Sequence, residues 1–309
     1  MSDTTAGRPD DVATARSRIA AHLVGREREL ELALAAVASG RDLILEGPPG
    51  TSKTTMLKAI TDEWGIPLVF VEGNADLTPA KLVGHHNPAR VLREDYSAEN
   101  FVPGPLAQAM RDGGFLYIEE FNRAPEDTLN TLLTAMADRA IQVPRVGRIQ
   151  ALPTFRVIAS MNPYDNVGTT RLSMSVSDRL NRIVVDYQDA AAEERIVALR
   201  TGLAGDLADR LIPDVVAVTR ATRVHSDVRQ GSSVRGAIDC ALVVNELAQL
   251  RGLEGPGDER YAETVYDGML VALSGRIRTD EAAETTPERV LREIWEDRFI
   301  LEPATAAPG

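Results

Sequence analysis

The sequence predicts an α/β fold, in which one parallel sheet of five strands is flanked by helices and followed by a small all-helical domain. Short apolar runs recur along the N-terminal part, separated by segments whose apolar residues are spaced for a helix. Runs without polar alternation indicate strands buried on both faces, as in parallel sheets covered by helices. The five predicted strands end near Glu46, Glu72, Glu119, Ser160 and Tyr187.

Composition limits the class of protein. The 309 residues, 44% of them hydrophobic, can bury a substantial core and are enough for two domains. The net charge of −12, from 34 basic and 46 acidic residues, argues against nucleic acid as the main partner. Cys240 is the only cysteine, which excludes a disulfide framework and a thiolate zinc site. No run approaches the roughly 20 apolar residues of a membrane span, so we expect no membrane span and a cytoplasmic protein.

Changes in pattern divide the chain into four segments. Residues 1–17 are polar and lack apolar periodicity, so we expect disorder there. Residues 18–189 carry the strand and helix pattern. Residues 190–301 contain helical patterns without a convincing strand, broken by Gly202, Pro213 and the flexible stretch 252–257. Residues 302–309 are expected to be an unstructured tail.

The first predicted strand, Leu43 to Leu45, leads into a candidate phosphate-binding loop. A glycine-containing turn breaks the strand, and a helical pattern with Met56, Leu57 and Ile60 follows. Strand, glycine loop and helix in this order is the context that a phosphate loop requires, because small side chains let the backbone N–H groups surround a triphosphate. The candidate binding residues are Gly47, Pro48, Pro49, Gly50, Thr51, Ser52, Lys53, Thr54 and Thr55.

Two side chains of this loop have specific expected roles. Lys53 would reach the β- and γ-phosphates, and Thr54 would offer its hydroxyl to Mg²⁺ at the positive end of the following helix. Glycine usually precedes the lysine, and Ser52 stands there instead. Either the loop tolerates a Cβ at this point or the site is impaired. The alternative interpretation is a glycine turn that happens to precede Lys-Thr.

A long connection, Gly73 to Pro105, follows the second predicted strand, Leu68 to Val71. Its apolar ends and polar middle predict a small hairpin or loop that projects from the core. His85 and His86 within it do not predict a metal site, because adjacent histidines point in different directions and no cysteine or third histidine is close in sequence.

The third predicted strand, Phe115 to Ile118, runs into two carboxylates, Glu119 and Glu120. The carboxyl ends of parallel strands are where open α/β sheets bind ligands. Glu119 is expected to reach the hydrated Mg²⁺, and Glu120 to polarise a water aligned with the γ-phosphate. The alternative is a solvated strand end.

A helix over Pro125 to Asp138 is predicted next, with core residues Leu129, Leu132, Leu133 and Met136. A turn from Gln142 to Gln150 separates it from the fourth strand, Phe155 to Ser160. Asn162 follows that strand, where its amide could hold the attacking water or sense the γ-phosphate. Asparagine before proline is also a common turn element, which is the alternative.

Three arginines precede or enter the fifth strand, Ile183 to Val185, and they are Arg171, Arg179 and Arg182. In the helical segment, Gly231 to Arg235 opens a helix with Val234, Ile238 and Leu242 on one face.

These motifs together resemble the MoxR-type AAA+ ATPases over roughly residues 19 to 280. Residues 47–54 are similar to a Walker A motif and Phe115 to Glu120 to a Walker B motif, while Asn162 matches a sensor 1 position and Arg235 a sensor 2 position. Further matching stretches are Val24 to Glu27, Leu82 to Gly84, Gly104 to Leu106, and Glu120 to Ala124. Three positions depart from the pattern: Ser52, Glu119 in place of the commoner aspartate, and Met161 in place of the usual glutamine.

The resemblance implies a ring-forming, often hexameric ATPase that binds ATP and Mg²⁺ and acts as a chaperone on other proteins. It implies that Val24 and Gly25 contact the nucleotide, that Glu120, Asn162 and Arg235 serve hydrolysis, and that Arg179 reaches the γ-phosphate of the next subunit. Arg171 or Arg182 could be the arginine that reaches the next subunit instead. The alternative for Arg179 is a salt bridge within the chain, to Asp178 or a nearby acidic residue. Partners would be further copies of the chain, a protein with a von Willebrand factor A domain, and a client enzyme or complex.

Two classes of function remain open on the sequence. The first is an ATP-hydrolysing chaperone that remodels clients, and the second is a scaffold that assembles on ATP with negligible turnover. Glu120 favours the first, because a scaffold needs no carboxylate to polarise water. Gas-vesicle and Rubisco-activating ATPases share these motifs, so the client is not determined by them.

Overall fold

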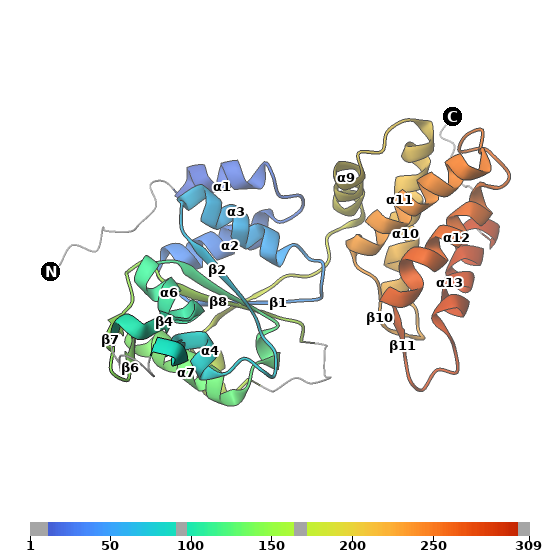
Figure 1. Cartoon of the computed structure of the whole chain (residues 1–309). Coiled ribbons are helices and arrows are strands. Elements are labelled where there is room, and N and C mark those ends of the chain that lie inside the picture. The colour runs from blue at the N-terminus through green and yellow to red at the C-terminus, as the bar shows by residue number, and fades with distance from the viewer. Residues whose placement is uncertain (1–11, 91–97, 164–171, 302–309) are drawn as a thin grey trace. The chain divides into compact units, whose positions relative to one another are not determined.

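The computed structural model describes residues 12–90, 98–163 and 172–301. The chain divides into two compact units, Met1–Asp186 and Tyr187–Gly309, close to the boundary expected near residue 190 (Figure 1). The expectations of disorder for residues 1–11 and 302–309 lie outside the described residues.

A five-stranded parallel sheet forms the centre of the first unit, as the sequence predicts. Its strand order is β2-β5-β8-β1-β9, and every neighbouring pair is parallel. The strands are β1 (Leu43–Glu46), β2 (Leu68–Glu72), β5 (Phe115–Glu119), β8 (Arg156–Met161) and β9 (Asn181–Val184).

Helices cover both faces of this sheet, because successive side chains of each strand enter different cores. Leu43, Leu45 and Tyr117 pack with the helices α1 (Val12–Ala20), α2 (Glu27–Ala38) and α3 (Lys53–Trp64). Ile44, Leu116 and Ile118 belong to the core on the other face. That face carries α4 (Pro79–Val83), α6 (Pro105–Asp112) and α7 (Glu126–Asp138), as Figure 1 shows.

The structure corrects several expectations for this unit. Residues 12–17 are helical, not disordered; Ala15 and Ile19 are the buried residues of α1, too few to produce an apolar period. The stretch expected as a turn before the fourth strand is a hairpin of β6 (Ala140–Val143) and β7 (Gly147–Gln150). Leu133 is only partly buried.

The long connection after β2 does contain the expected hairpin. Strands β3 (Gly84–His86) and β4 (Phe101–Pro103) pair in antiparallel fashion. The short helix α4 precedes β3, and the 3₁₀ turn η1 (Ala98–Asn100) precedes β4. Two further short elements complete the unit: the 3₁₀ turn η2 (Phe121–Arg123) and the helix α8 (Met174–Ser177).

The second unit is mainly helical. Its helices are α9 (Ala190–Thr201), α10 (Asp206–Val224), α11 (Val234–Arg251), α12 (Tyr261–Leu273) and α13 (Pro287–Glu296), with short turns η3 (Ser274–Arg276) and η4 (Asp297–Leu301). It is not all-helical, because β10 (Val228–Gln230) and β11 (Arg278–Thr279) form an antiparallel ribbon. Strands of this length carry no periodic signal in the sequence.

Two expectations for the helices of this unit are also corrected. Pro213 does not interrupt the helical pattern, because it lies inside helix α10, between the buried residues Ile212 and Asp214. The helix expected to open within Gly231 to Arg235 begins at Val234, which is buried. Of the other two expected residues, however, Ile238 is only partly buried and Leu242 is 39% exposed.

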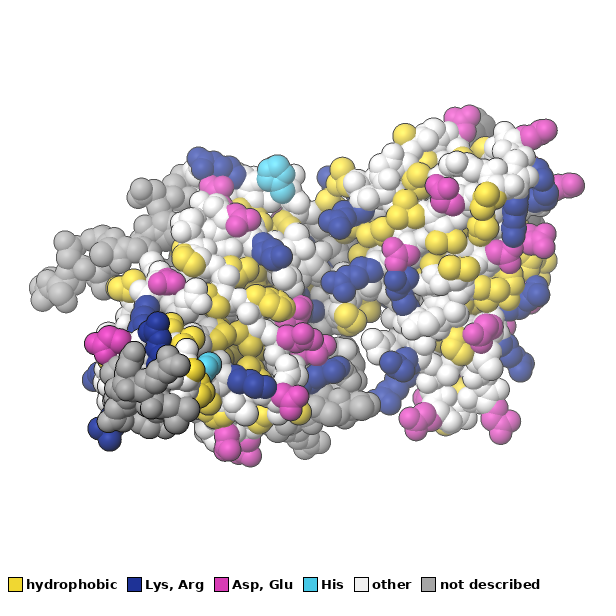
Figure 2. Space-filling model, in the orientation of Figure 1, with side chains coloured by type: hydrophobic (Ala, Val, Ile, Leu, Met, Phe, Trp, Pro, Cys, Tyr) yellow, Lys and Arg dark blue, Asp and Glu magenta, His cyan; other side chains and the backbone are white. Residues whose placement is uncertain are grey.

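Two surface properties bear on possible partners. Within the described residues, no helix is long and apolar enough to cross a membrane. On the face shown in Figure 2, acidic and basic side chains are interspersed over both units.

We predict that Cys240 reports the unfolding of the second unit. It is fully buried in α11, and burial raises the pKa of its thiol from 9.0 to about 12. Iodoacetamide should therefore leave the native protein unmodified and alkylate it once denaturant is added. Between these two pKa values the unfolded chain holds fewer protons than the folded one, so stability should fall as the pH rises above about 9. Rapid alkylation of native protein, followed by mass spectrometry, would contradict this packing.

Candidate nucleotide site

The carboxyl ends of three neighbouring strands bring the predicted phosphate loop, Glu119, Glu120 and Asn162 to one edge of the sheet. Strand β8 lies between β1 and β5, with Glu46 opposite Met161 and Ile118 opposite Ala159. The loop after β1, Asn162 after β8, and the carboxylates at the end of β5 therefore lie side by side. This convergence follows from the strand order and not from closeness in sequence.

The loop after β1 has the backbone that a phosphate loop requires. A Cβ on Gly47 would lie 1.9 Å from the carbonyl oxygen of Val185, so only glycine fits there. Gly50 and Ser52 both adopt left-handed conformations, with φ of 77° and 65°. The conformation at Ser52 explains why glycine is usual before the lysine, because a side chain costs about 1 kcal/mol in that region.

Lys53 lies at the centre of the loop. Its buried ammonium donates hydrogen bonds to the carbonyl oxygens of Gly47 and Pro48, at 2.9 and 2.7 Å. It also donates to the hydroxyl of Thr51 at 3.2 Å. Helix α3 begins at Lys53. The ammonium group and the first unpaired backbone N–H groups therefore both belong to the N-terminal end of this helix. An anion bound there would meet both.

Thr54 and Glu119, the two residues predicted to hold Mg²⁺, are in direct contact. The Thr54 hydroxyl donates to Oε1 of Glu119 at 3.1 Å. A hydroxyl and a carboxylate are hard oxygen donors of the kind that Mg²⁺ prefers, so this pair fits the ion. Thr55, on the same turn of α3, is exposed.

Tyr117 joins this pair and was not singled out from the sequence. Its hydroxyl lies 3.1 Å from Oγ1 of Thr54 and 2.9 Å from Oγ of Ser160, and it donates to Glu119 at 3.4 Å. Burial raises the pKa of Tyr117 above its usual range, so the phenol stays protonated. The available signal was strand periodicity, which places residue 117 on the same face as Glu119.

Glu120 and Asn162 lie at the same edge but are held differently. Glu120 adopts a left-handed conformation with φ of 53°, and its Oε2 lies 3.3 Å from Nε of Arg123. The side chain of Glu120 is 42% exposed. Asn122 donates a long hydrogen bond of 3.5 Å to the carbonyl oxygen of Asn162. Glu120 and Asn162 thus follow the ends of β5 and β8 at the same edge of the sheet as the loop.

The segment Val24-Gly25 is tied to the same region through Arg26. Arg26 is buried, donates to the carbonyl oxygen of Asp186, and pairs with Glu29 at 3.1 Å. Asp186 directly follows Val185, the residue against which Gly47 packs. Arg26 thus connects the start of α2 to the end of β9, a role that no pattern in the sequence indicated.

Arg179 and Arg182 lie in different surroundings. Arg182 pairs with Glu46 at the end of β1. Arg179 precedes β9 and so lies at the amino edge of the sheet, because Asn181 pairs with Leu43 at the start of β1. Its guanidinium donates to the carbonyl oxygen of Ser175 at 3.0 Å, and no ion pair joins it to Asp178 within the described residues. Arg171 lies outside the described residues.

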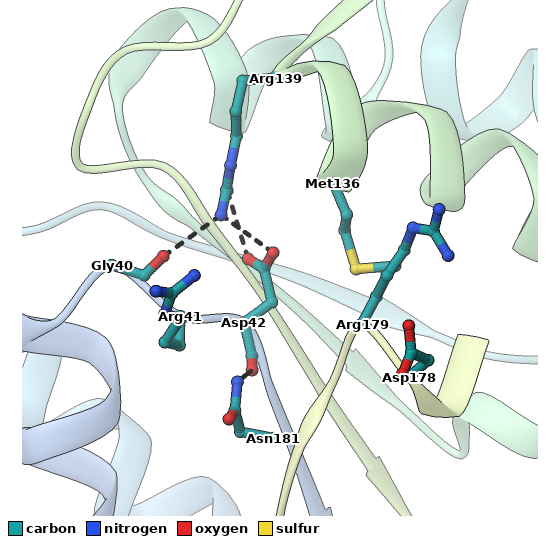
Figure 3. Close-up of a pocket in the computed structure, with 8 residues that line it drawn as sticks. All are labelled: Gly40, Arg41, Asp42, Met136, Arg139, Asp178, Arg179 and Asn181. Atoms are coloured by element: carbon teal, nitrogen blue, oxygen red, sulfur yellow. Dashed lines mark hydrogen bonds and ion pairs between the residues drawn. The ribbon is translucent and has the colours of Figure 1, made fainter. Parts of the chain in front are cut away.

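A pocket of about 370 Å³ occupies this amino edge (Figure 3). Arg139 and Asp42, two of its lining residues, form an ion pair of 3.0 Å. Burial raises the pKa of Asp42 above its usual range, against the lowering effect of Arg139. The lining residues are Gly40, Arg41, Asp42, Met136, Arg139, Asp178, Arg179 and Asn181.

Arg235 belongs to the second unit. It is exposed on the first turn of α11, where the Ser233 hydroxyl caps the helix by accepting from the Arg235 N–H at 3.3 Å.

The fold and the loop define a class of protein, the P-loop nucleotide-binding proteins. A family model described as an AAA domain of the dynein-related subfamily matches residues 42–180. The gas vesicle ATPase GvpN of Ancylobacter aquaticus is 31% identical over 80% of this chain and 70% of its own length. The chain belongs to this family of AAA+ ATPases.

Two further similarities extend this result. The gas vesicle ATPase GvpN1 of Halobacterium salinarum is 26% identical over 82% of this chain and 72% of its own length. The Holliday junction branch migration motor RuvB of Thermotoga maritima superposes with a TM-score of 0.53 at 19% identity, over 83% of this chain and 72% of that one. At that identity the second similarity concerns the fold alone.

We predict that Ser52→Gly binds nucleotide as well as the parent protein or more tightly, because it removes the side chain from a left-handed position. Ser52→Val should weaken binding, since a branched side chain fits that region worst. Titration with a fluorescent ATP analogue measures both. Equal affinity for the valine variant would show that the left-handed backbone at residue 52 is not needed for binding.

Proposed function

We propose that this protein binds Mg-ATP and hydrolyses it to remodel or activate client proteins, as a MoxR-type AAA+ ATPase. The observation that carries the proposal is the contact of Thr54 with Glu119 beside the buried ammonium of Lys53, at the sheet edge that also holds Glu120 and Asn162.

Each residue has a chemical part in this proposal. Lys53 and the N–H groups at the start of α3 bind the phosphates and offset their charge. Thr54 and Glu119 would hold Mg²⁺, which would offset negative charge on the phosphates. Glu120, released from Arg123, accepts a proton from the attacking water, and Asn162 orients that water.

Similarity to known proteins suggests two kinds of client. Two relatives are named gas vesicle ATPases, which favours gas-vesicle assembly as a second candidate function. The resemblance to MoxR-type proteins supports a client enzyme or complex together with a von Willebrand factor A domain partner in the cytoplasm. The purified protein would be incubated, with and without ATP, with gas-vesicle proteins and separately with a von Willebrand factor A domain protein. ATP-dependent binding to one of them would distinguish the two candidate functions.

We predict that Lys53→Ala and Glu120→Gln fail in different ways. Lys53→Ala should weaken ATP binding, because it removes the cation from the centre of the loop. Glu120→Gln should keep affinity within about threefold and lower phosphate release by a factor on the order of 100 or more, the range expected for a catalytic acid or base. Calorimetric titration and a phosphate-release assay measure the two effects.

The same measurements test the scaffold alternative. A wild-type protein that binds ATP but releases no phosphate above the Glu120→Gln background would favour a scaffold with negligible turnover. Hydrolysis by Glu120→Gln at the wild-type rate would show that another group polarises the water.

The positions of the arginines support a ring in which each site is completed by the next subunit. Strand β1 has 4 residues and therefore separates the loop from the amino edge by about 13 Å. Arg179 lies at that far edge, and Arg182 is already paired with Glu46. We infer that Arg179 serves a neighbouring copy, whose loop faces it in a closed head-to-tail ring of about six subunits.

We predict that Arg179→Ala and Lys53→Ala subunits, each inactive alone, recover part of the hydrolysis when mixed. An interface with an intact Lys53 and an intact Arg179 can then form. The control mixes Arg179→Ala with the Lys53→Ala, Arg179→Ala double variant, which offers no intact pair and should stay inactive. Co-assembly is checked by light scattering. An inactive first mixture that still assembles would remove Arg179 from this role.

A further inference from the structure

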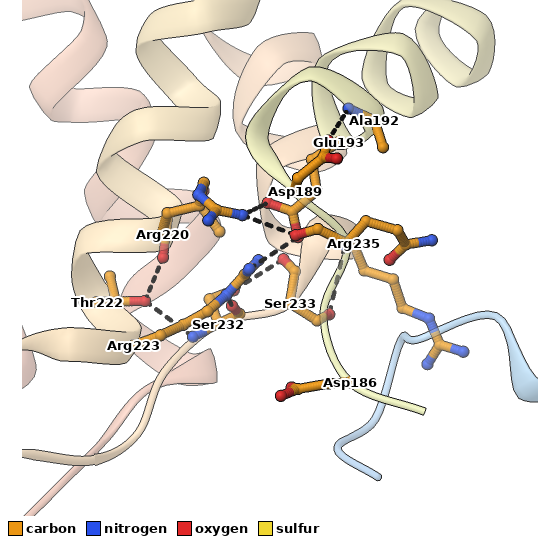
Figure 4. A network of polar contacts seen from close by, with 12 residues as sticks. Asp186, Asp189, Ala192, Glu193, Arg220, Thr222, Arg223, Ser232, Ser233 and Arg235 are labelled. Atoms are coloured by element: carbon orange, nitrogen blue, oxygen red, sulfur yellow. Dashed lines mark hydrogen bonds and ion pairs between the residues drawn. The ribbon is translucent and has the colours of Figure 1, made fainter. Parts of the chain in front are cut away.

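The second unit contains a buried ionic network that the proposed chemistry leaves unused. Glu193, on the first turn of α9, is 1% exposed. It accepts from Nη1 of Arg223 at 2.7 Å and from Nη1 of Arg220 at 3.3 Å, both near the end of α10 (Figure 4). The side chain of Arg223 is itself only 9% exposed.

These three side chains join two separate pieces of backbone. On one side lies the segment that opens the second unit: Arg220 donates to the carbonyl oxygen of Gln188 at 2.8 Å, and the guanidinium of Arg223 stacks 3.9 Å from the ring centre of Tyr187. On the other side, Nε of Arg223 donates to the carbonyl oxygen of Ser232 at 2.7 Å.

The loop that contains Ser232 is held against α10 at two more points. The N–H of Ser232 donates to the hydroxyl of Thr222 at 2.9 Å. A Cβ on Gly231 would lie 2.6 Å from backbone atoms of Arg223, so glycine allows the loop to approach the helix this closely. The loop then ends at Ser233, which caps α11, and Arg235 follows on the first turn. The backbone that leads into Arg235 is therefore held by the contacts of Arg223 and Thr222 with Ser232.

Stability alone does not explain this arrangement. A buried ionic cluster is often no more stabilising than apolar residues of the same volume, because its charges are removed from water. Nη2 of Arg223 is buried without a hydrogen-bond partner among the described residues, which adds to that cost. What the network provides, and apolar packing would not, is a directional link from the opening segment to the loop before α11.

We propose that Glu193 and Arg223 are positioning residues that lock Arg235 to residues 187–188, so that Arg235 follows any movement of this segment as part of one rigid body. The proposal rests on the proposed function, in which Arg235 serves hydrolysis. It adds that Arg223 affects turnover only by positioning Arg235.

A double-mutant cycle tests this route. Arg223→Met keeps most of the side-chain volume and removes the polar contacts. It should lower kcat about tenfold while the apparent KM for ATP changes less, a size within the range for coupled neighbours. In an Arg235→Ala background the same substitution should lower kcat by less than about twofold. A purely structural role would give the same factor in both backgrounds.

The chain offers a matched control in Asp214. This buried carboxylate also interacts with two arginines, Arg298 at 2.9 Å and Arg210 at 3.6 Å, and accepts from the Tyr261 hydroxyl at 2.9 Å. It connects α10 to α12 and to the segment Asp297–Leu301, not to the loop before α11. Asp214→Asn should lower the melting temperature, and its effect on kcat should be the same with and without Arg235.

The outcomes separate this inference from the proposed function. If Arg223→Met and Arg235→Ala act additively on kcat, or if Arg235→Ala leaves kcat unchanged, the inference is overturned. Wild-type hydrolysis that is lost in Glu120→Gln would still support the proposed function. Should Arg223→Met fail to fold, Thr222→Val removes one contact of the same loop, and Glu193→Gln removes the charge of the network; the same cycle then applies to them.

Discussion

The pairing of β1 with β8 on one side and β9 on the other determines where the loop around Lys53 lies relative to Asn162 and Arg179. The register with β8 brings the loop after β1 beside Asn162. The register with β9 presses Gly47 against Val185 and leaves no room for a side chain. The same pairing places Arg179 at the opposite edge of the sheet, because Asn181 pairs with Leu43 at the start of β1.

The buried polar groups of the first unit show how this edge is kept in place. Tyr117 exchanges hydrogen bonds with Ser160 and Thr54 at the end of the sheet, and Tyr117 and Thr54 both donate to the carboxylate of Glu119. Unsatisfied hydroxyls at this depth would each cost about 1–3 kcal/mol, so the four side chains depend on one another. The left-handed residues Ser52 and Glu120 add local strain at the two points where the chain turns toward the site.

The second unit also contains buried polar side chains that contact one another. Its apolar core needs only complementary volume, whereas Glu193, Arg220 and Arg223 fix directions between segments that are distant in sequence. Hydrogen bonds and ion pairs have preferred directions, so these contacts define how the joined segments are oriented, which apolar contacts do not. The short ribbon of β10 and β11 lies at the start of the loop that the network holds.

The sequence by itself determined the parallel sheet, the loop around Lys53, the two carboxylates at the end of the third strand and the arginine at the start of α11. Each of these depends on local pattern: apolar runs, glycine spacing and helical periodicity. It did not determine the partners of Tyr117, the clamp of Arg26 on Asp186, the separation of Arg179 from Arg182, or the short strands of the hairpins and the ribbon. Those follow from strand order and from contacts between segments far apart in the chain. Such contacts leave no period in the sequence, so only the tertiary structure decides them.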